Sequence, residues 1–163
     1  DWTPTRTATR IPKPKDDEDS FFAETLGTQR TIRQCLTLRP TKGADEHPEV
    51  REVRTLLDLG SGMNGHPNVC HGGFVATMLD EILGVLVQLI LEKKLKSRLH
   101  EGGNVFTAYL TTNYKKPTPT PSIVLCTAKF DRQERNKIYV VGSIEDGMGT
   151  VYATGEGMFV HVK

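Results

Sequence analysis

The sequence predicts an α+β fold in which one long, buried helix lies across a largely antiparallel sheet. Residues 74–98 place apolar side chains around almost the whole helical circumference, which is typical of a helix covered on most sides. Four strand-like runs with short connections follow, and short connections favour antiparallel neighbours. With 163 residues, 37% of them hydrophobic, the chain is long enough for one domain with its own core.

The composition argues against several classes of protein. Lys and Arg total 21 and Asp and Glu total 20, so a net charge of +1 argues against a strongly electrostatic partner such as nucleic acid. The three cysteines are widely spaced and odd in number, which favours a reducing, intracellular compartment, either cytoplasmic or mitochondrial. The longest apolar stretch is interrupted by Asp80, Glu81 and Gln88, so we expect no membrane span.

The first fifty residues are predicted to lie outside the main domain. Residues 1–19 contain three prolines and an acidic run, and we expect a flexible tail because such a stretch buries little apolar surface. Residues 20–50 are predicted to be an N-terminal extension, in which Phe21, Phe22 and Leu26 can form a short docking helix.

The predicted main domain covers residues 51–163. A strand is expected at 53–59, while 31–39 before it fits a strand or a helix and 40–49 is a loop by composition. After the helix, strands are expected at 106–111, 123–130, 138–144 and 151–162, with turns at 131–136 and 146–149.

The loop before the helix carries the first chemical signal. Residues 65–81 read GHPNVCHGGFVATMLDE and bring Gly72 and Gly73 to the helix N-terminus. Free N–H groups point out of a helix there, and glycine lets a ligand approach the backbone closely, so this loop is a candidate oxyanion hole. A glycine-rich loop that only turns the chain from strand to helix is the commoner alternative.

Asp80 is the second candidate. It lies among apolar residues on a helix that should be buried, where an unpaired carboxylate is costly. It therefore lies beside a functional cleft or at an exposed seam, and an ordinary solvated acid is the alternative. Glu81 follows about 100° around the helix, so we do not expect the two carboxylates to face the same place.

The separation of the two signals predicts a dimer. Gly72 and Asp80 lie about 12 Å apart along a helix that rises 1.5 Å per residue. Within one chain they cannot both act on one carbonyl group. If both act on one substrate, they come from two subunits with antiparallel helices.

Metal and thiol chemistry are weaker interpretations. The histidines and Cys70 show no zinc-type spacing, so we expect no metal and no cofactor. Cys70 is expected to be a small packed thiol rather than a nucleophile.

These motifs resemble a known family. HGGFVATMLD is similar to the His-Gly-Gly-x-x-x-Thr-x-x-Asp signature of hotdog-fold acyl-CoA thioesterases of the PaaI/4HBT type. GHPNVCHGG and FTAYLTTNYKKPTP resemble the Them4/Them5 branch most, over about residues 52–162. The resemblance implies a curved antiparallel sheet wrapped around the central helix, homodimers that often pair into tetramers, and hydrolysis of an acyl-CoA thioester to a free acid and CoA.

The resemblance also implies residue roles. Asp80 falls on the catalytic acid, as general base or nucleophile, and Gly72 on the glycine whose N–H polarises the thioester carbonyl. His71 falls on the motif histidine that shapes the loop, and Thr107 on the Ser/Thr that orients water or the acid. The candidate substrate-binding residues are Gly73, Asn64, Asn68, Lys115 and Lys116, the two lysines as a grip on the CoA phosphates.

One position departs from the family pattern. Some PaaI-type enzymes hold the attacking water with an asparagine six residues before the motif histidine, and here that position is Gly65. Asn64 and Asn68 lie out of register on either side of it.

Two other functions stay open at this stage. One is a hotdog enoyl-CoA hydratase or dehydratase that uses His71 and Glu81, and the other is a non-catalytic acyl-CoA-binding module. The spacing from the glycines to Asp80 favours the thioesterase, and nothing in the sequence identifies the acyl group.

Overall fold

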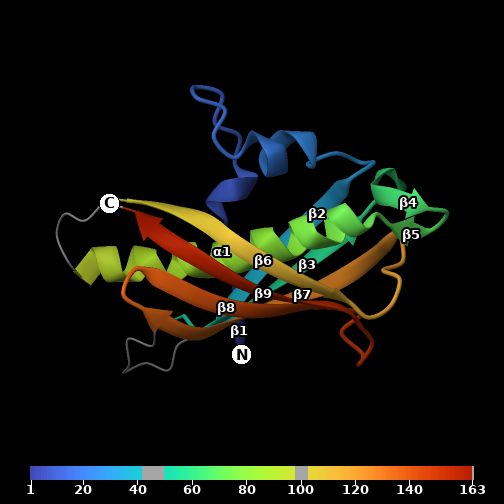
Figure 1. The fold of residues 1–163 in the computed structure, drawn as a ribbon. Helices are drawn as coiled ribbons and strands as arrows, with labels where there is room; N and C mark the ends of the chain where they lie inside the picture. Colours follow the sequence, from blue (N-terminus) through green and yellow to red (C-terminus); the bar gives the residue numbers. More distant parts are fainter. Residues whose placement is uncertain (42–49, 98–102, 163) are drawn as a thin grey trace.

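The computed structural model describes residues 1–41, 50–97 and 103–162, which form one seven-stranded sheet, a two-stranded ribbon and a long helix (Figure 1). The strand order in the large sheet is β1-β2-β3-β7-β8-β9-β6, and every neighbouring pair is antiparallel. These strands are β1 (Trp2–Thr5), β2 (Ile32–Pro40), β3 (Glu52–Leu59), β6 (Asn104–Tyr114), β7 (Ser122–Glu134), β8 (Lys137–Glu145) and β9 (Val151–Val162). The ribbon is β4 (Asn64–His66) with β5 (Val69–Cys70), and the short helical turns are η1 (Ala8–Arg10), η2 (Phe21–Thr25) and η3 (Ser61–Met63).

Helix α1 (Gly72–Ser97) lies very close to one face of the sheet. Leu79 and Leu83 are fully buried in this interface. Each of these leucines packs against a glycine of the sheet. A Cβ on Gly155 would lie 3.1 Å from Leu79 Cδ1, and a Cβ on Gly142 would lie 3.1 Å from Leu83 Cδ2. Missing side chains on the strands therefore make room for the leucines of the helix.

The elements of the main domain agree with the sequence prediction, with one exception. The helix and the later strands lie where they were expected, and 31–39 proves to be a strand; most of the expected loop at 40–49 lies outside the described residues. The exception is the turn expected at 131–136, because β7 continues to Glu134 and β8 begins at Lys137. These residues are exposed and polar because the hairpin extends beyond the core, where Arg132 stacks 3.7 Å from the ring centre of Tyr139.

Two strands from the N-terminal part of the chain, β1 and β2, belong to the same sheet as the later strands. β1 pairs with β2, β2 pairs with β3, and Ile32 of β2 is buried in the common core. The guanidinium of Arg54 lies 4.2 Å from the ring centre of Trp2. Composition alone does not reveal this, since the main-chain pairing of β1 and β2 and a few buried apolar side chains hold the segment.

The expected docking helix corresponds to η2. Phe22 and Leu26 are buried in the core, whereas Phe21 is 53% exposed. In Figure 1 the blue N-terminal segment with η1 and η2 lies against α1, on the side of the helix away from β8. The helix is thus covered by the sheet on one side and by this segment on another.

The helix passes a length-and-composition test for a membrane span over Gly72–Glu92, although acidic residues interrupt it. More than half of the apolar window is buried inside the fold. Core helices of folded domains pass the same test, and here the apolar residues pack on the sheet.

We predict that Gly142→Ala will destabilise the protein by about 1–3 kcal/mol, because its Cβ would lie 2.8 Å from the carbonyl oxygen of Thr127 and would press on Leu83. Gly84→Ala is the matched control: its Cβ would meet only Phe159 at 3.6 Å, and alanine favours a helix, so stability should be unchanged or up to about 1 kcal/mol higher. Urea unfolding measures both. Equal stability of the Gly142 variant and wild type would contradict the close packing described above.

Candidate active site

The first turn of α1 leaves one backbone N–H free. His71 caps the helix, because its Nδ1 accepts a hydrogen bond of 2.9 Å from the N–H of Gly73. The carbonyl of His71 accepts the N–H groups of Phe74 and Val75. Among the described residues, the N–H of Gly72 has no hydrogen-bond partner. Of the two glycines, Gly72 therefore keeps the free donor and Gly73 does not.

A neighbouring strand fixes the orientation of this turn. The hydroxyl of Tyr114, at the end of β6, donates a hydrogen bond of 2.8 Å to the carbonyl of Gly72. This hydroxyl therefore positions the peptide group next to the free donor.

The loop ahead of the helix is held by residues 118–120. The N–H of Cys70 donates to the carbonyl of Thr118, and the hydroxyl of Thr120 donates to the side chain of Asn64. Asn68 has a φ of 58° in the turn between β4 and β5. Asn64 and Asn68 thus shape the loop, and the structure gives neither a place in the pocket described below.

Gly65 is required by packing. A Cβ at this position would lie 3.0 Å from the Cα of His71. The position where some related enzymes carry an asparagine therefore has no room for a side chain while His71 keeps its present place.

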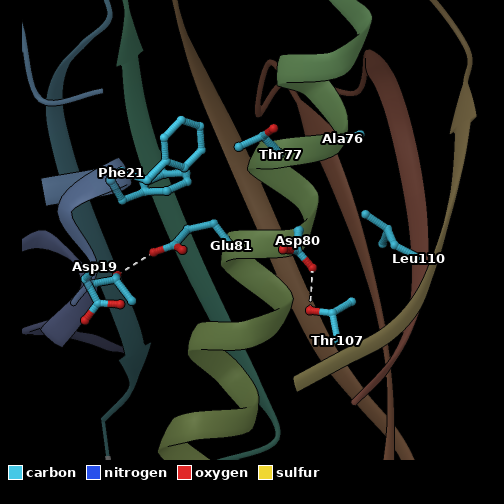
Figure 2. Close-up of a pocket in the computed structure, with 10 residues that line it drawn as sticks. Asp19, Phe21, Ala76, Thr77, Asp80, Glu81, Thr107 and Leu110 are labelled. Atoms are coloured by element: carbon cyan, nitrogen blue, oxygen red, sulfur yellow. Dashed lines mark hydrogen bonds between the residues drawn. The ribbon is translucent and has the colours of Figure 1, made fainter. Parts of the chain in front are cut away.

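Asp80 and Thr107 meet at the open edge of the sheet. The hydroxyl of Thr107, on β6, donates a hydrogen bond of 2.8 Å to Oδ1 of Asp80 (Figure 2). Asp80 is partly exposed, so the carboxylate is reachable while one of its oxygens is fixed. The sequence predicted both residues, and the structure brings them together.

Both residues line a cavity of about 560 Å³ that also contains Glu81. Figure 2 shows the two carboxylates leaving the helix in different directions, Asp80 toward β6 and Glu81 toward the N-terminal segment. The two carboxylates therefore point in different directions, as expected from the 100° step, and one cavity is lined by both.

Glu81 is the most strongly perturbed acid at the site. Burial raises the pKa of its carboxyl from 4.5 to about 7, against the opposing effect of a hydrogen bond from the hydroxyl of Thr9. The charges of Asp19 and Asp80 raise this pKa further, and the charge of Arg10 lowers it. At neutral pH Glu81 is thus present in both protonation states.

The remaining candidates lie apart from this cavity. Lys115 and Lys116 are exposed just beyond β6, and neither forms an ion pair with a described residue. Burial raises the pKa of the Cys70 thiol to about 12, so it is a packed thiol at neutral pH, as predicted. No group of three potential metal-ligating side chains comes together in the described part of the chain.

Sequence reasoning missed the contribution of the N-terminal segment. Thr9, Asp19, Phe21 and Phe22 all line the cavity around Asp80. The paired phenylalanines were the only signal in the sequence, and they indicated docking rather than a place in the site.

A long helix wrapped by a curved antiparallel sheet, with a glycine turn and an acid on that helix, defines a hotdog-fold protein, as predicted. Residues 67–153 match the family model described as Thioesterase superfamily. The chain belongs to this superfamily.

Relatives with curated names point to the predicted branch. The chain is 32% identical to an acyl-coenzyme A thioesterase THEM4 from Bos taurus over 67% of this chain and 41% of that protein. It is 28% identical to the human acyl-coenzyme A thioesterase THEM5 over 71% of this chain and 43% of that protein. The chain spans less than half the length of these relatives.

Solved structures show the same fold. A thioesterase superfamily protein has a TM-score of 0.56 and 32% identity, covering 67% of this chain and 48% of that chain. A Bacillus halodurans protein solved with CoA has a TM-score of 0.54 and 26% identity, covering 73% of this chain and 72% of that chain.

The raised pKa of Glu81 predicts a pH-dependent stability. Between about pH 4.5 and 7 Glu81 binds more protons in the folded state than in the unfolded state, so its contribution to stability is largest below about pH 4.5 and is lost as the pH rises through 7. We expect Glu81→Gln to reduce this pH-dependent loss in the free energy of unfolding by about 1–3 kcal/mol. Urea unfolding at pH 5, 6, 7 and 8 measures it, and pH profiles that run parallel in wild type and variant would count against a buried, ionising Glu81.

Proposed function

We propose that this protein is an acyl-CoA thioesterase that hydrolyses a thioester to a free acid and CoA. The observation that carries the proposal is the carboxylate of Asp80, fixed by Thr107 in a cavity at the sheet edge. Membership of the Thioesterase superfamily and the names of the relatives support it. Because the match covers less than half of the length of those relatives, the activity is assigned to this chain as a proposal.

The chemistry needs an activated nucleophile and a donor for the oxyanion. Asp80 accepts a proton from the attacking water, or attacks the carbonyl carbon itself. Meanwhile the hydroxyl of Thr107 holds one oxygen of the Asp80 carboxylate by a hydrogen bond. The N–H of Gly72 stabilises negative charge on the carbonyl oxygen as the tetrahedral centre forms. The C–S bond then breaks, and the CoA thiolate takes up the proton that Asp80 accepted from water. If Asp80 itself attacked the carbonyl carbon, water then hydrolyses the anhydride between the acyl group and Asp80, which releases the free acid and restores the carboxylate.

We propose that each site is shared between two subunits. Gly72 does not line the cavity that contains Asp80, and the two lie about 12 Å apart along the helix. β6 offers the surface for pairing: it is an edge strand of eleven residues with Phe106 and Tyr109 exposed. A second copy paired through β6 would bring two antiparallel helices together, and pairing of such dimers would give a tetramer.

The exposed lysines beyond β6 suit the other end of the substrate. Lys115 and Lys116 follow Tyr114, which contacts Gly72, so they lie on the same side of the fold as the oxyanion donor. We assign them to the phosphates of CoA.

The proposed location is inside the cell, in the cytoplasm or the mitochondrion. All three cysteines are free in the structure, as suits a reducing compartment. A yeast relative, 29% identical over 63% of this chain and 39% of its own length, is named an uncharacterized mitochondrial membrane protein.

The two alternatives have less support. A hydratase that uses His71 and Glu81 is disfavoured because Nδ1 of His71 accepts the N–H of Gly73 and His71 does not line the cavity that contains Glu81. A non-catalytic acyl-CoA-binding module remains the competing outcome of the first experiment below.

We predict that Asp80→Asn lowers thiol release from acyl-CoA by 100-fold or more, which corresponds to about 2.7 kcal/mol in the barrier, because the amide neither accepts the proton nor attacks. The assay compares a panel of acyl-CoAs from short to long and aryl, with the exposed Asp131→Asn as control. Equal turnover by the Asp80 variant, or no turnover by wild type, would favour a binding module.

Mixed dimers test the shared site. Gly72→Pro removes the free N–H at the first helical position, a position that tolerates proline, and this variant should be inactive. Gly72→Ala is the control: it keeps the N–H, its Cβ has room 3.5 Å from Tyr114, and it should stay active. When differently tagged Gly72→Pro and Asp80→Asn chains are co-expressed, purified heterodimers should regain about half of the wild-type activity, since one of their two sites is intact. Heterodimers as inactive as both parents would show that each site lies within one chain.

A further inference from the structure

The cavity around Asp80 has one wall that lies outside the family-matched residues 67–153. This N-terminal wall consists of Thr9, Asp19, Phe21 and Phe22, which supply four of the ten lining residues (Figure 2). A segment that carries no family motif is therefore part of the cavity that contains the proposed catalytic acid.

Two hydrogen bonds hold the N-terminal wall in place. The hydroxyl of Thr9 donates one to Glu81 of the central helix, and within the segment the guanidinium of Arg10 donates one of 2.7 Å to the carbonyl of Phe22. Phe22 is 6% exposed, and the ring of Phe21 stands edge-on to it, with ring centres 5.9 Å apart. Phe21 thus presents a half-exposed apolar ring that packs on the buried ring of Phe22.

The charges around the cavity are all negative. Asp19, Asp80 and Glu81 line it, and none of its described lining residues is basic. Asp19 is paired with Lys13, which does not line the cavity, so its charge is largely compensated. Asp80 and Glu81 have hydroxyl partners only, so their charges are not compensated by an ion pair among the described residues.

We propose that the N-terminal wall is the acyl-binding surface, that Phe21 and Phe22 hold an uncharged apolar acyl group, and that Glu81 excludes acyl groups that end in a carboxylate. This inference rests on the proposed thioesterase function and adds its substrate class. Glu81 acts here as a specificity-determining residue, not a catalytic one.

The physical reason is the combination of repulsion and burial. An acyl carboxylate beside Glu81 would lose its hydration and meet like charge, whereas an alkyl or aryl group would cover the exposed ring of Phe21. The charged or titratable groups that interact with Glu81 are Arg10, Asp19 and Asp80, with Cys35 opposite on β2. Because Glu81 gains its charge near pH 7, the exclusion should strengthen from pH 6 to pH 8.

Two thioether analogues that cannot be hydrolysed test the proposal by titration calorimetry on the full chain. They are S-hexyl-CoA and S-(5-carboxypentyl)-CoA, which place a methyl group or a carboxylate at the end of comparable chains. The variants are Glu81→Gln, which keeps an acceptor for Thr9, and Phe21→Ala; Glu92→Gln, an exposed glutamate on the same helix, is the matched control.

Wild type and Glu92→Gln should bind the hexyl analogue about tenfold or more tightly at pH 8 than the carboxypentyl analogue, with a smaller ratio at pH 6. Glu81→Gln should lower the ratio of hexyl to carboxypentyl affinity by about fivefold or more and remove the pH dependence of that ratio. Phe21→Ala should weaken hexyl binding several-fold without changing the affinity for CoA itself.

A ratio that is the same in Glu81→Gln and wild type overturns the role of Glu81, and unchanged hexyl binding in Phe21→Ala overturns the acyl-binding wall. Both readouts are equilibrium affinities, so they do not depend on turnover. Failure of the thioesterase proposal shows instead as no thiol release from any acyl-CoA while these analogues still bind.

Discussion

The structure depends on one constraint: helix α1 is buried on nearly all sides, yet it carries two adjacent acids near its middle. Its leucines pack against a sheet that has glycines at the contact points, so the helix is held in place and both acids are only partly exposed. Each acid accepts a hydrogen bond from a hydroxyl of another segment, Thr107 for Asp80 and Thr9 for Glu81. A partly buried carboxylate is tolerated when it is hydrogen-bonded, and these two contacts join both segments to the helix.

The position of Asp80 follows from where the sheet ends. β6 is the last strand, so the helix face beside it has no further strand to cover it, and a partly exposed carboxylate can face an opening there. The same strand carries Thr107 near its start and Tyr114 at its end, so it contacts both Asp80 and Gly72. One strand therefore aligns the acid and the free N–H at opposite ends of the same helical segment.

The sequence was most informative where periodicity or glycine spacing expresses the fold directly. The all-round apolar pattern after Gly72 revealed the helix, and the glycine turn, Asp80 and Thr107 could be assigned from motif order. The pairing of β1 and β2 and the wall formed by Phe21 could not, because these depend on main-chain hydrogen bonds and on contacts between segments far apart in the chain. The shared cavity of Asp80 and Glu81 was missed for the same reason: helical geometry gives directions, but not what lies opposite.

In the proposed enzyme, two adjacent residues of the helix have different roles: Asp80 in catalysis and Glu81 in the choice of acyl group. Asp80 faces β6, where the motif residues lie, and Glu81 faces a segment that the family model does not include. Changes in Thr9, Phe21 or Glu81 can therefore alter the acyl-binding wall while the hydrogen bond between Thr107 and Asp80 is kept. The match to the family model includes Glu81 but not Thr9, Phe21 or Phe22, so the wall proposed to hold the acyl group is built from residues that the family model does not describe.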